Sequence, residues 1–295
     1  MKRVAWILVA FAIALSVIAA RMRCRDGVVT QRFATFNIEN FPKDARQIDG
    51  AFAQIAEIGA SFVAVQEISE PALFAIEAER RLGAAWEFVH LDTAPWTSRT
   101  TRPMHAGATG KSHHNGVVFD TRVWTLVSTR AHHETRIGER HKPTFEVRLR
   151  PVAGGSIVRV LVVHLKSGGA NEDIRERQLR GLGAILAKGD PDEPTILLGD
   201  FNATGDRDRN NLAALATKGR VQWATRDLSC SAFWSREDAC PRSRLDHVFV
   251  TQRALRVEAA GACATHGCEA TDSCPIWADH VSDHCPVVVT VEAAR

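Results

Sequence analysis

The chain has 295 residues, 45% of them hydrophobic and 24% charged, a composition typical of a globular protein with a sizeable core. This length suits one large domain or two ordinary ones, and no internal repeat or low-complexity run divides it. The formal net charge of +3 excludes a strongly basic protein, so charge alone does not indicate a polyanion ligand.

The first segment, residues 1–20, is typical of a signal peptide. Lys2 and Arg3 precede an apolar run over residues 4–20, which has the length of a signal core and is slightly short for a membrane span. Small residues end this run, as signal peptidase requires, and basic residues follow it. The alternative is an uncleaved N-terminal anchor. In either case we expect a secreted or periplasmic protein.

Two kinds of apolar pattern alternate along the rest of the chain. Short runs rich in β-branched residues predict strands, whereas apolar positions three and four residues apart predict helices. In chain order these are strand Gln31–Ile38, helix Lys43–Ile58, strand Phe62–Gln66, helix Glu70–Leu82, strands Gly116–Phe119, Thr144–Leu149 and Ile157–Leu165, helix Glu172–Lys188, and strands Thr195–Leu198, Leu245–Val250 and Pro286–Val291. The order predicts an α/β protein with two sheets packed face to face and helices outside. No linker divides residues 27–295, so we expect one domain there.

Six of the seven cysteines lie in the last third of the chain, which in an exported protein predicts disulfides that close surface loops. We expect Cys230 to pair with Cys240, because these two residues bracket a short polar loop. The pairing of Cys263, Cys268 and Cys274 is left open by the sequence. Spacing without a paired C-x₂-C element disfavours a zinc site. The odd cysteine is Cys24 or Cys285.

Polar side chains gather where the predicted strands begin or end. A carboxylate or histidine in such a place is most often a turn or cap residue when it stands alone. Here six segments share the feature: Asn37-Ile38-Glu39-Asn40, Gln66-Glu67, His164-Leu165-Lys166-Ser167, Gly199-Asp200-Phe201-Asn202, Leu245-Asp246-His247 and Ser282-Asp283-His284. Oxygen donors without a Cys/His cluster suit Mg²⁺, Mn²⁺ or Ca²⁺ rather than zinc. Histidines beside such a cation are what hydrolysis of a phosphodiester requires.

This ordered set of segments resembles the endonuclease/exonuclease/phosphatase superfamily, which has the DNase I-like fold. The resemblance runs from about Phe33 to Val289, and its Gly-Asp-Phe-Asn and Ser-Asp-His signatures are specific when they occur together. It implies a four-layer α/β/β/α sandwich of two packed mixed sheets, with the active site at one edge. It also implies a divalent-metal-dependent hydrolase, with Mg²⁺ as the first choice of cofactor.

The resemblance also implies roles for individual residues. Glu67 would be the principal metal ligand, with Asn37 and Asp283 close to the same cation. Asp200 and Asn202 would orient the attacking water and the phosphate, or hold a second cation.

The two histidines of the set would carry the proton chemistry. His284 would be a general base or a phosphate contact, oriented by Asp246. His164 would be the partner acid or a hydrogen-bond donor to the transition state. Neither the sequence nor the resemblance decides which group takes the proton of the attacking water.

The chain departs from the secreted nucleases of the superfamily at positions that contact substrate. Asn115 stands where those nucleases supply a carboxylate to one catalytic histidine, so His164 would lack its acidic partner. The sequence contains no tyrosine, so the tyrosine that such nucleases place against the minor groove is absent, and His113 or His114 would substitute. Lys166 and Lys142 are candidate phosphate contacts. Further basic residues at Arg99, Arg102, Arg136 and Arg140 would supply backbone affinity.

Three functions are compatible with this pattern, and we favour a DNA endonuclease. RNA as the substrate, and end rather than internal cleavage, stay open. A phospholipid phosphodiesterase would need an exposed apolar loop, for which Pro95-Trp96 and Phe233-Trp234 are the candidates. An inactive binding module is disfavoured because Glu67, Asp200, Asp246 and His284 are all present. We expect a monomer without a stable protein partner, at a membrane only if residues 1–20 are an anchor.

Overall fold

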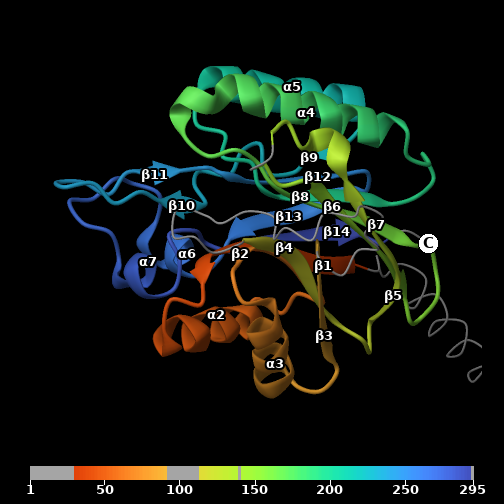
Figure 1. The fold of residues 1–295 in the computed structure, drawn as a ribbon, viewed down its shortest axis with the longest axis horizontal. Coiled ribbons are helices and arrows are strands. Elements are labelled where there is room, and N and C mark those ends of the chain that lie inside the picture. Colours follow the sequence, from red (N-terminus) through yellow and green to blue (C-terminus); the bar gives the residue numbers. More distant parts are fainter. Residues whose placement is uncertain (1–29, 92–112, 139–140, 294–295) are drawn as a thin grey trace, which may run out of the picture. The chain divides into compact units, whose positions relative to one another are not determined.

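The computed structural model describes residues 30–91, 113–138 and 141–293. Two six-stranded sheets pack face to face, and helices cover the outer face of each (Figure 1). Each sheet contains parallel and antiparallel pairs. The predicted four-layer α/β/β/α sandwich is therefore confirmed. The segment predicted to be a signal peptide, residues 1–20, lies outside the described residues, so its cleavage stays a prediction.

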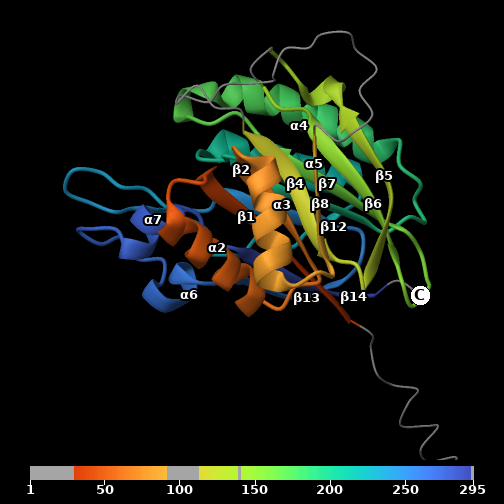
Figure 2. The same cartoon turned by 60° about the horizontal axis from the view of Figure 1, so that its bottom comes forward.

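The first sheet has the strand order β13-β14-β1-β2-β4-β3. Its strands are β1 (Thr30–Phe41), β2 (Phe62–Ile68), β3 (Trp86–His90), β4 (His114–Asp120), β13 (Ala254–Ala259) and β14 (Val287–Glu292). Helices α2 (Ala45–Glu57) and α3 (Pro71–Leu82) cover its outer face (Figure 2). They bury Phe52, Ile55 and Phe74 against the sheet. Asp44 caps α2 by accepting a hydrogen bond from the backbone N–H of Gln47.

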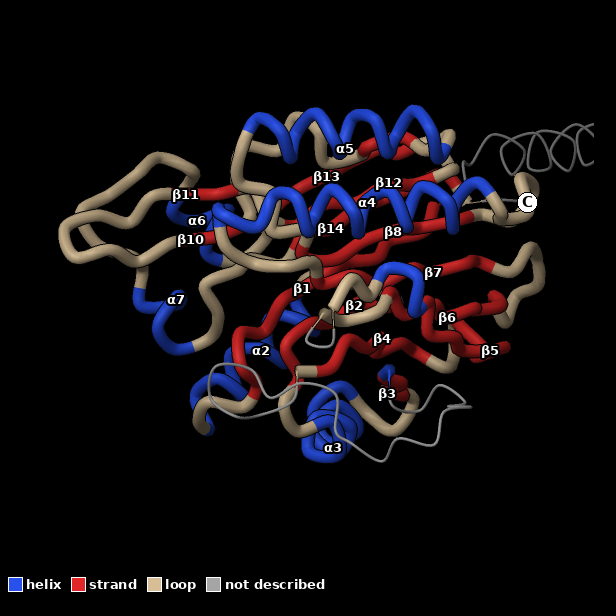
Figure 3. Tube along the Cα trace, turned by 45° about the horizontal axis from the view of Figure 1, so that its top comes forward, coloured by secondary structure: helices blue, strands red, loops and turns tan. Residues whose placement is uncertain are grey.

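The second sheet has the strand order β5-β6-β7-β8-β12-β9. Its strands are β5 (Trp124–His132), β6 (Thr144–Pro151), β7 (Val158–His164), β8 (Thr195–Asp200), β9 (Gln222–Trp223) and β12 (Asp246–Val250). Helices α4 (Glu172–Ala187) and α5 (Asp206–Gly219) lie side by side on its outer face (Figure 3). A buried ion pair between Arg175 and Asp208 joins the two helices, with Nη2 and Oδ2 2.7 Å apart.

The layer between the two sheets holds the largest apolar cluster. Phe33 and Phe62 stack with ring centroids 5.2 Å apart, and Trp124 packs edge-on against Phe62. The indole N–H of Trp124 donates to the hydroxyl of Ser61, so its polar atom is satisfied inside the core. Each such buried ring stabilises the fold by roughly 1.5–3 kcal/mol. The sheets are therefore held rigidly enough to position residues at their ends.

Every strand and helix predicted from the sequence is present, with ends shifted by a few residues. The sequence patterns missed β3, β5, β13 and α5. They also missed the short helices α6 (Ala262–His266) and α7 (Ile276–His280) and the short strands β9, β10 (Ala232–Phe233) and β11 (Arg242–Ser243). In β5 the reason is its position at the edge of the sheet, because the strand buries only Trp124 and His132 and so has no continuous apolar run. In α5 the buried residues are Asp208, Leu212 and Leu215, too few apolar positions to reveal a helical period.

Three disulfides join the C-terminal cysteines: Cys230–Cys268, Cys240–Cys274 and Cys263–Cys285. The predicted pairing of Cys230 with Cys240 is wrong. These two residues lie on opposite arms of the β10–β11 hairpin but out of register, since Ala232 faces Ser243 and Phe233 faces Arg242. Cys285 is bonded rather than free, and Cys24 lies outside the described residues.

The disulfides bear on the location of the protein. Three bonds within one region indicate an oxidising environment outside the cytoplasm. Among the described residues, no helix is both long enough and apolar enough to cross a membrane.

Candidate active site

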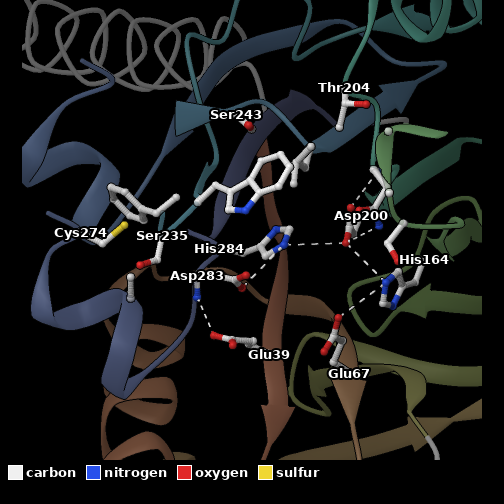
Figure 4. A pocket seen from close by; sticks show the side chains of 18 of the residues that line it. Glu39, Glu67, His164, Asp200, Thr204, Ser235, Ser243, Cys274, Asp283 and His284 are labelled. Carbon is white, nitrogen blue, oxygen red and sulfur yellow. Dashed lines mark hydrogen bonds and ion pairs between the residues drawn. The ribbon is translucent and has the colours of Figure 1, made fainter. Parts of the chain in front are cut away.

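Strand ends from both sheets meet at a cavity of about 560 Å³. Its lining includes residues that follow or end β1, β2, β7 and β8, together with residues of the C-terminal loops. Figure 4 shows Glu67, His164 and Asp200 on one side, with Asp283 and His284 between them and Ser235. Residues that are up to 245 positions apart in the chain, from Glu39 to His284, thus share one cavity.

Asp200 lies at the centre of the polar cluster. Its Oδ2 accepts hydrogen bonds from the amide nitrogens of Asn37 (3.0 Å) and Asn202 (2.9 Å). The same oxygen is 3.5 Å from Nε2 of His164 and 3.8 Å from Nε2 of His284. Asp200 therefore contacts four of the other residues expected at the site.

The backbone around Asp200 explains the Gly-Asp-Phe-Asn sequence. Gly199 has φ +140°, and a Cβ atom there would lie 2.0 Å from the carbonyl oxygen of Val163 on the neighbouring strand. No side chain fits that position. Asn202 has φ +51°, a conformation that asparagine tolerates, and its N–H donates to Oδ1 of Asp200. The motif thus turns the chain tightly at the end of β8.

Glu67 extends into the cavity from the end of β2. Its φ of +62° is rare for a residue with a long side chain, and such strain is found mostly at functional sites. Oε1 accepts from the amide of Asn37 (3.3 Å), and Oε2 accepts from the backbone N–H of Asn40 (3.1 Å). Asn37 therefore bridges Glu67 and Asp200 through its nitrogen, while its Oδ1 accepts from the N–H of Glu39.

His284 is held by a chain of hydrogen bonds. Its Nδ1 lies 2.8 Å from Oδ2 of Asp246, which also accepts from the hydroxyl of Ser231 at 2.7 Å. Its backbone N–H donates to the hydroxyl of Ser282, which in turn donates to the carbonyl of Asn37. These contacts fix the imidazole and leave Nε2 facing the carboxylates of the cavity.

His164 has a basic rather than an acidic partner at Nδ1. The ammonium Nζ of Lys142 lies 2.8 Å away, so Nδ1 accepts and the proton of the neutral ring is on Nε2. That Nε2 lies 3.6 Å from Oε1 of Glu67. Asn115, which replaces the carboxylate expected here, is fully buried, and neither atom of its amide has a hydrogen-bond partner.

The pKa shifts show that charge is distributed unevenly over the cluster. Burial raises the pKa of Glu67, but the basic side chains around it, His164 and Lys142 foremost, outweigh burial and hold it at about 2. Burial lowers the pKa of Lys142 to about 8. Burial also lowers the pKa of His164 well below its ordinary value, and Lys142 adds to this effect. His164 is therefore neutral at pH 7.

The carboxylates beside His284 behave in the opposite way. Burial, with Asp246 nearby, raises the pKa of Asp200 to about 7 despite the attraction of His284. Burial together with Glu39 raises the pKa of Asp283 to about 6. Burial disfavours the charged form of His284, but the surrounding carboxylates raise its pKa well above the ordinary value. His284 therefore carries the positive charge that offsets the carboxylates around it.

These residues fit a divalent cation. Oδ1 of Asp283 and Oδ1 of Asp246 are buried and make no hydrogen bond, and several carboxylates face one cavity. Such an excess of hard oxygen donors suits Mg²⁺, Mn²⁺ or Ca²⁺. Asp200, Asp246 and His284 also bring one ligand atom each to within 4.8 Å of the others, a buried arrangement that resembles a metal site. Of the expected ligands, Glu67 and Asp283 line the cavity directly.

The predicted substrate contacts Lys142, Lys166 and Asn115 are not among the residues that line the cavity, although Lys142 contacts His164. Trp96, Arg99, Arg102 and Arg140 fall in segments that the structure does not describe.

The sequence analysis assigned no role to two contributors to the site, Glu39 and Ser231. Glu39 lines the cavity and accepts from the backbone N–H of Asp283 at 3.0 Å. Ser231 supports Asp246. His113, which the sequence suggested as a substrate contact, lies with Nδ1 3.6 Å from Oε2 of Glu67. Glu39 was visible as a carboxylate two residues after Asn37, whereas Ser231 lies in an irregular loop and gives no sequence signal.

Comparisons with known proteins agree with this geometry. The model of the Endonuclease/Exonuclease/phosphatase family matches residues 34–284, so the chain belongs to that family. Members of the family are mostly metal-dependent phosphoesterases. No curated protein sequence matches the chain.

Solved structures show the same fold at low sequence identity. TDP2 from D. rerio, complexed with a single-strand DNA product, has a TM-score of 0.66 and 15% identity over 90% of this chain and 99% of that one. An AP endonuclease from Archaeoglobus fulgidus has a TM-score of 0.60 and 12% identity over 89% and 100% of the two chains. A mannosyl-6-phosphatase from Bacteroides thetaiotaomicron has a TM-score of 0.59 and 15% identity over 88% and 98%. These similarities establish the fold alone.

Proposed function

We propose that this protein is an exported phosphodiesterase that uses a divalent cation, with Mg²⁺ as first choice, to hydrolyse nucleic acid. We favour DNA as the substrate and internal cleavage as the mode. The observation that carries the proposal is the convergence of Glu67, His164, Asp200, Asp283 and His284 on one cavity. An inactive binding module would have no need to maintain strain at Glu67 or a crowd of buried carboxylates.

Glu67 and Asp283 would hold the cation, with Asp200 beside them. A bound divalent cation neutralises charge on phosphoryl oxygens and lowers the pKa of a water molecule. The same carboxylates stabilise both a bound cation and the protonated form of His284. Cation binding would therefore favour loss of the proton from His284, and protonation of His284 would weaken cation binding. Asn37 would need to turn its amide to offer an oxygen, because its nitrogen donates to Glu67 and Asp200.

The side chains of the cluster can each perform a step of phosphodiester hydrolysis. Asp200, held by Asn37 and Asn202, is placed to orient a water molecule and to accept its proton. His164 presents Nε2–H as a donor to a phosphoryl oxygen, since Lys142 occupies its Nδ1. His284, charged and oriented by Asp246, can bind a phosphoryl oxygen or give a proton to the leaving oxygen.

The second candidate function is a phospholipid phosphodiesterase. The observation in its favour is Trp234, which is 52% exposed and lines the cavity. An exposed indole is a common membrane anchor.

A side-by-side assay distinguishes the candidates. Supercoiled plasmid, single-stranded DNA, RNA and sphingomyelin are incubated with the full-length exported protein, once with Mg²⁺ and once with EDTA. We expect the plasmid to be nicked with Mg²⁺ and to stay intact with EDTA, and Glu67→Ala and His284→Ala to abolish nicking. Release of choline phosphate with an intact plasmid would overturn the nucleic acid proposal.

A further inference from the structure

A large aromatic side chain lies at the edge of the catalytic cavity and takes no part in the chemistry described above. Trp234 lines the same cavity as Glu67, Asp283 and His284, yet 52% of its surface is exposed. Indole rings are normally buried when they serve packing alone. An exposed ring beside a reaction site is therefore available to a ligand.

The backbone ties this ring to the catalytic residues. Trp234 directly follows Phe233, whose N–H donates to the carbonyl of Asp283 at 2.7 Å. Ala232 pairs with His284 in an isolated antiparallel bridge. A substrate group bound on Trp234 would thus lie close to His284.

Disulfides hold the hairpin that carries the ring. Cys230 precedes β10 and bonds to Cys268, and Cys240 precedes β11 and bonds to Cys274. Cys274 itself lines the cavity (Figure 4). Both arms of the hairpin are therefore anchored, and a ring held in place loses little conformational entropy on binding.

The surroundings of the ring are cationic and polar. The guanidinium of Arg236 lies 4.8 Å from the ring centre of Trp234, and that of Arg242 lies 4.4 Å from the ring centre of Phe233. Ser235 and Ser243 add hydroxyls to the cavity wall. On this side two aromatic rings have guanidinium groups against them, although neither arginine itself lines the cavity, whereas Glu67, His164 and Asp200 lie on the opposite side (Figure 4).

These features favour a planar ring over a lipid chain as the occupant. A membrane-docking loop needs several adjacent apolar side chains, but Trp234 is followed by Ser235, Arg236, Glu237 and Asp238. Nucleobases stack on aromatic side chains regardless of sequence, because every base has a π face, and arginine adds to the interaction.

We propose that Trp234, supported by Arg236, is a stacking platform for an unpaired nucleobase next to the scissile phosphodiester. The inference rests on the proposed function and adds that the base beside the scissile phosphodiester leaves the stack, as it does in a single strand or when it is flipped out of a duplex. The platform would bind the planar ring of any nucleobase without distinguishing one base from another.

Two small phosphodiesters with one leaving group test the platform. Thymidine 5′-(4-nitrophenyl phosphate) carries a base, and methyl 4-nitrophenyl phosphate does not, while both release 4-nitrophenolate. We expect Trp234→Ala to lower kcat/KM for the thymidine ester by about 5- to 150-fold, the range that corresponds to base–aromatic stacking, and to leave the methyl ester unchanged. Trp234→Phe should retain part of the preference. Ile76→Ala, an exposed apolar residue on α3, is the matched control and should change neither rate.

A binding measurement separates this inference from the proposed function. Anisotropy of a fluorescent oligothymidylate, measured with EDTA, needs no hydrolysis. Weaker binding by Trp234→Ala supports the platform even if the wild type hydrolyses neither ester. Absence of hydrolysis would overturn the proposed function but not the platform. Equal loss on both esters, no loss on either ester, or a loss confined to binding of sphingomyelin vesicles would each overturn the platform.

Discussion

Replacing Lys142 with methionine removes one hydrogen bond and nearly preserves side-chain volume. Nζ of Lys142 lies 2.8 Å from Nδ1 of His164, and a hydrogen bond to a charged group contributes about 1.5–3 kcal/mol. At about 1.36 kcal/mol per factor of ten in rate, its loss corresponds to a fall in kcat of about 10- to 150-fold. The reason is that Lys142 stabilises the tautomer of His164 that carries its proton on Nε2, from which it can donate to the phosphate.

A double-mutant cycle checks this prediction through rates of Mg²⁺-dependent oligonucleotide cleavage. If Lys142 acts through His164, then Lys142→Met should lower kcat in the wild type and have no further effect in His164→Ala. Lys142→Arg, which keeps the charge and the donor, should retain part of the activity. Equal losses in both backgrounds, with a higher KM and a weaker salt dependence, would show that Lys142 does not act through His164. Lys142 would then be the phosphate contact that the family resemblance implies.

Three further predictions concern stability, and urea or thermal unfolding measures each. Gly199→Ala should destabilise the fold by roughly 3 kcal/mol or prevent folding, because its Cβ would overlap Val163; near-wild-type stability would contradict the geometry. Burial raises the pKa of Glu146, but hydrogen bonds from His132 and Arg159 outweigh burial and lower the pKa from 4.5 to about 2. The ionised carboxylate therefore stabilises the fold above pH 4.5, and this contribution is lost as the pH falls towards 2. The loss is at most about 3 kcal/mol before solvent screening, and Glu146→Gln should remove this pH dependence. Cys263→Ser with Cys285→Ser opens a 22-residue separation and should cost about 3 kcal/mol, whereas an unchanged Tm would mean that the bond does not stabilise the fold.

Much of the fold could be predicted because its central strands are buried on both faces. Runs such as Phe62–Val65 and Ile196–Leu198 are apolar throughout, so their pattern is strong. Elements on the outside of the fold gave no such signal. Strand β5 buries only two of its nine side chains, and α5 buries only two apolar residues, so neither shows a clear apolar period.

The candidate site could be predicted as a set of residues but not as a set of contacts. The signatures around Asp200 and His284 bring their residues to one cavity, as expected from strand ends. The partner of His164 could not be found, because Lys142 is 22 positions away and its contact depends on how β6 and β7 pair.

The disulfides show the same limit. Sequence proximity favoured Cys230 with Cys240, but pairing depends on the distance between Cα atoms and the direction of the side chains. The observed partners lie 34 and 38 residues away, with Cα atoms 5.0 and 5.5 Å apart. Hairpin register decides this outcome, and the short strands β10 and β11 carry no period from which the register can be derived.

Metal-dependent phosphodiester hydrolysis is measured directly by the nicking of supercoiled plasmid, with the wild type compared with Glu67→Gln. Glu79→Gln, an exposed position on α3, serves as the matched control. We predict nicking by the wild type and the control with Mg²⁺, none with EDTA, and a loss of more than about 100-fold in Glu67→Gln at an unchanged Tm, because loss of a ligand should exceed the roughly 10- to 100-fold cost of losing an outer partner of a metal site. Nicking that persists in EDTA, or a Glu67→Gln protein as active as the control, would contradict the claim.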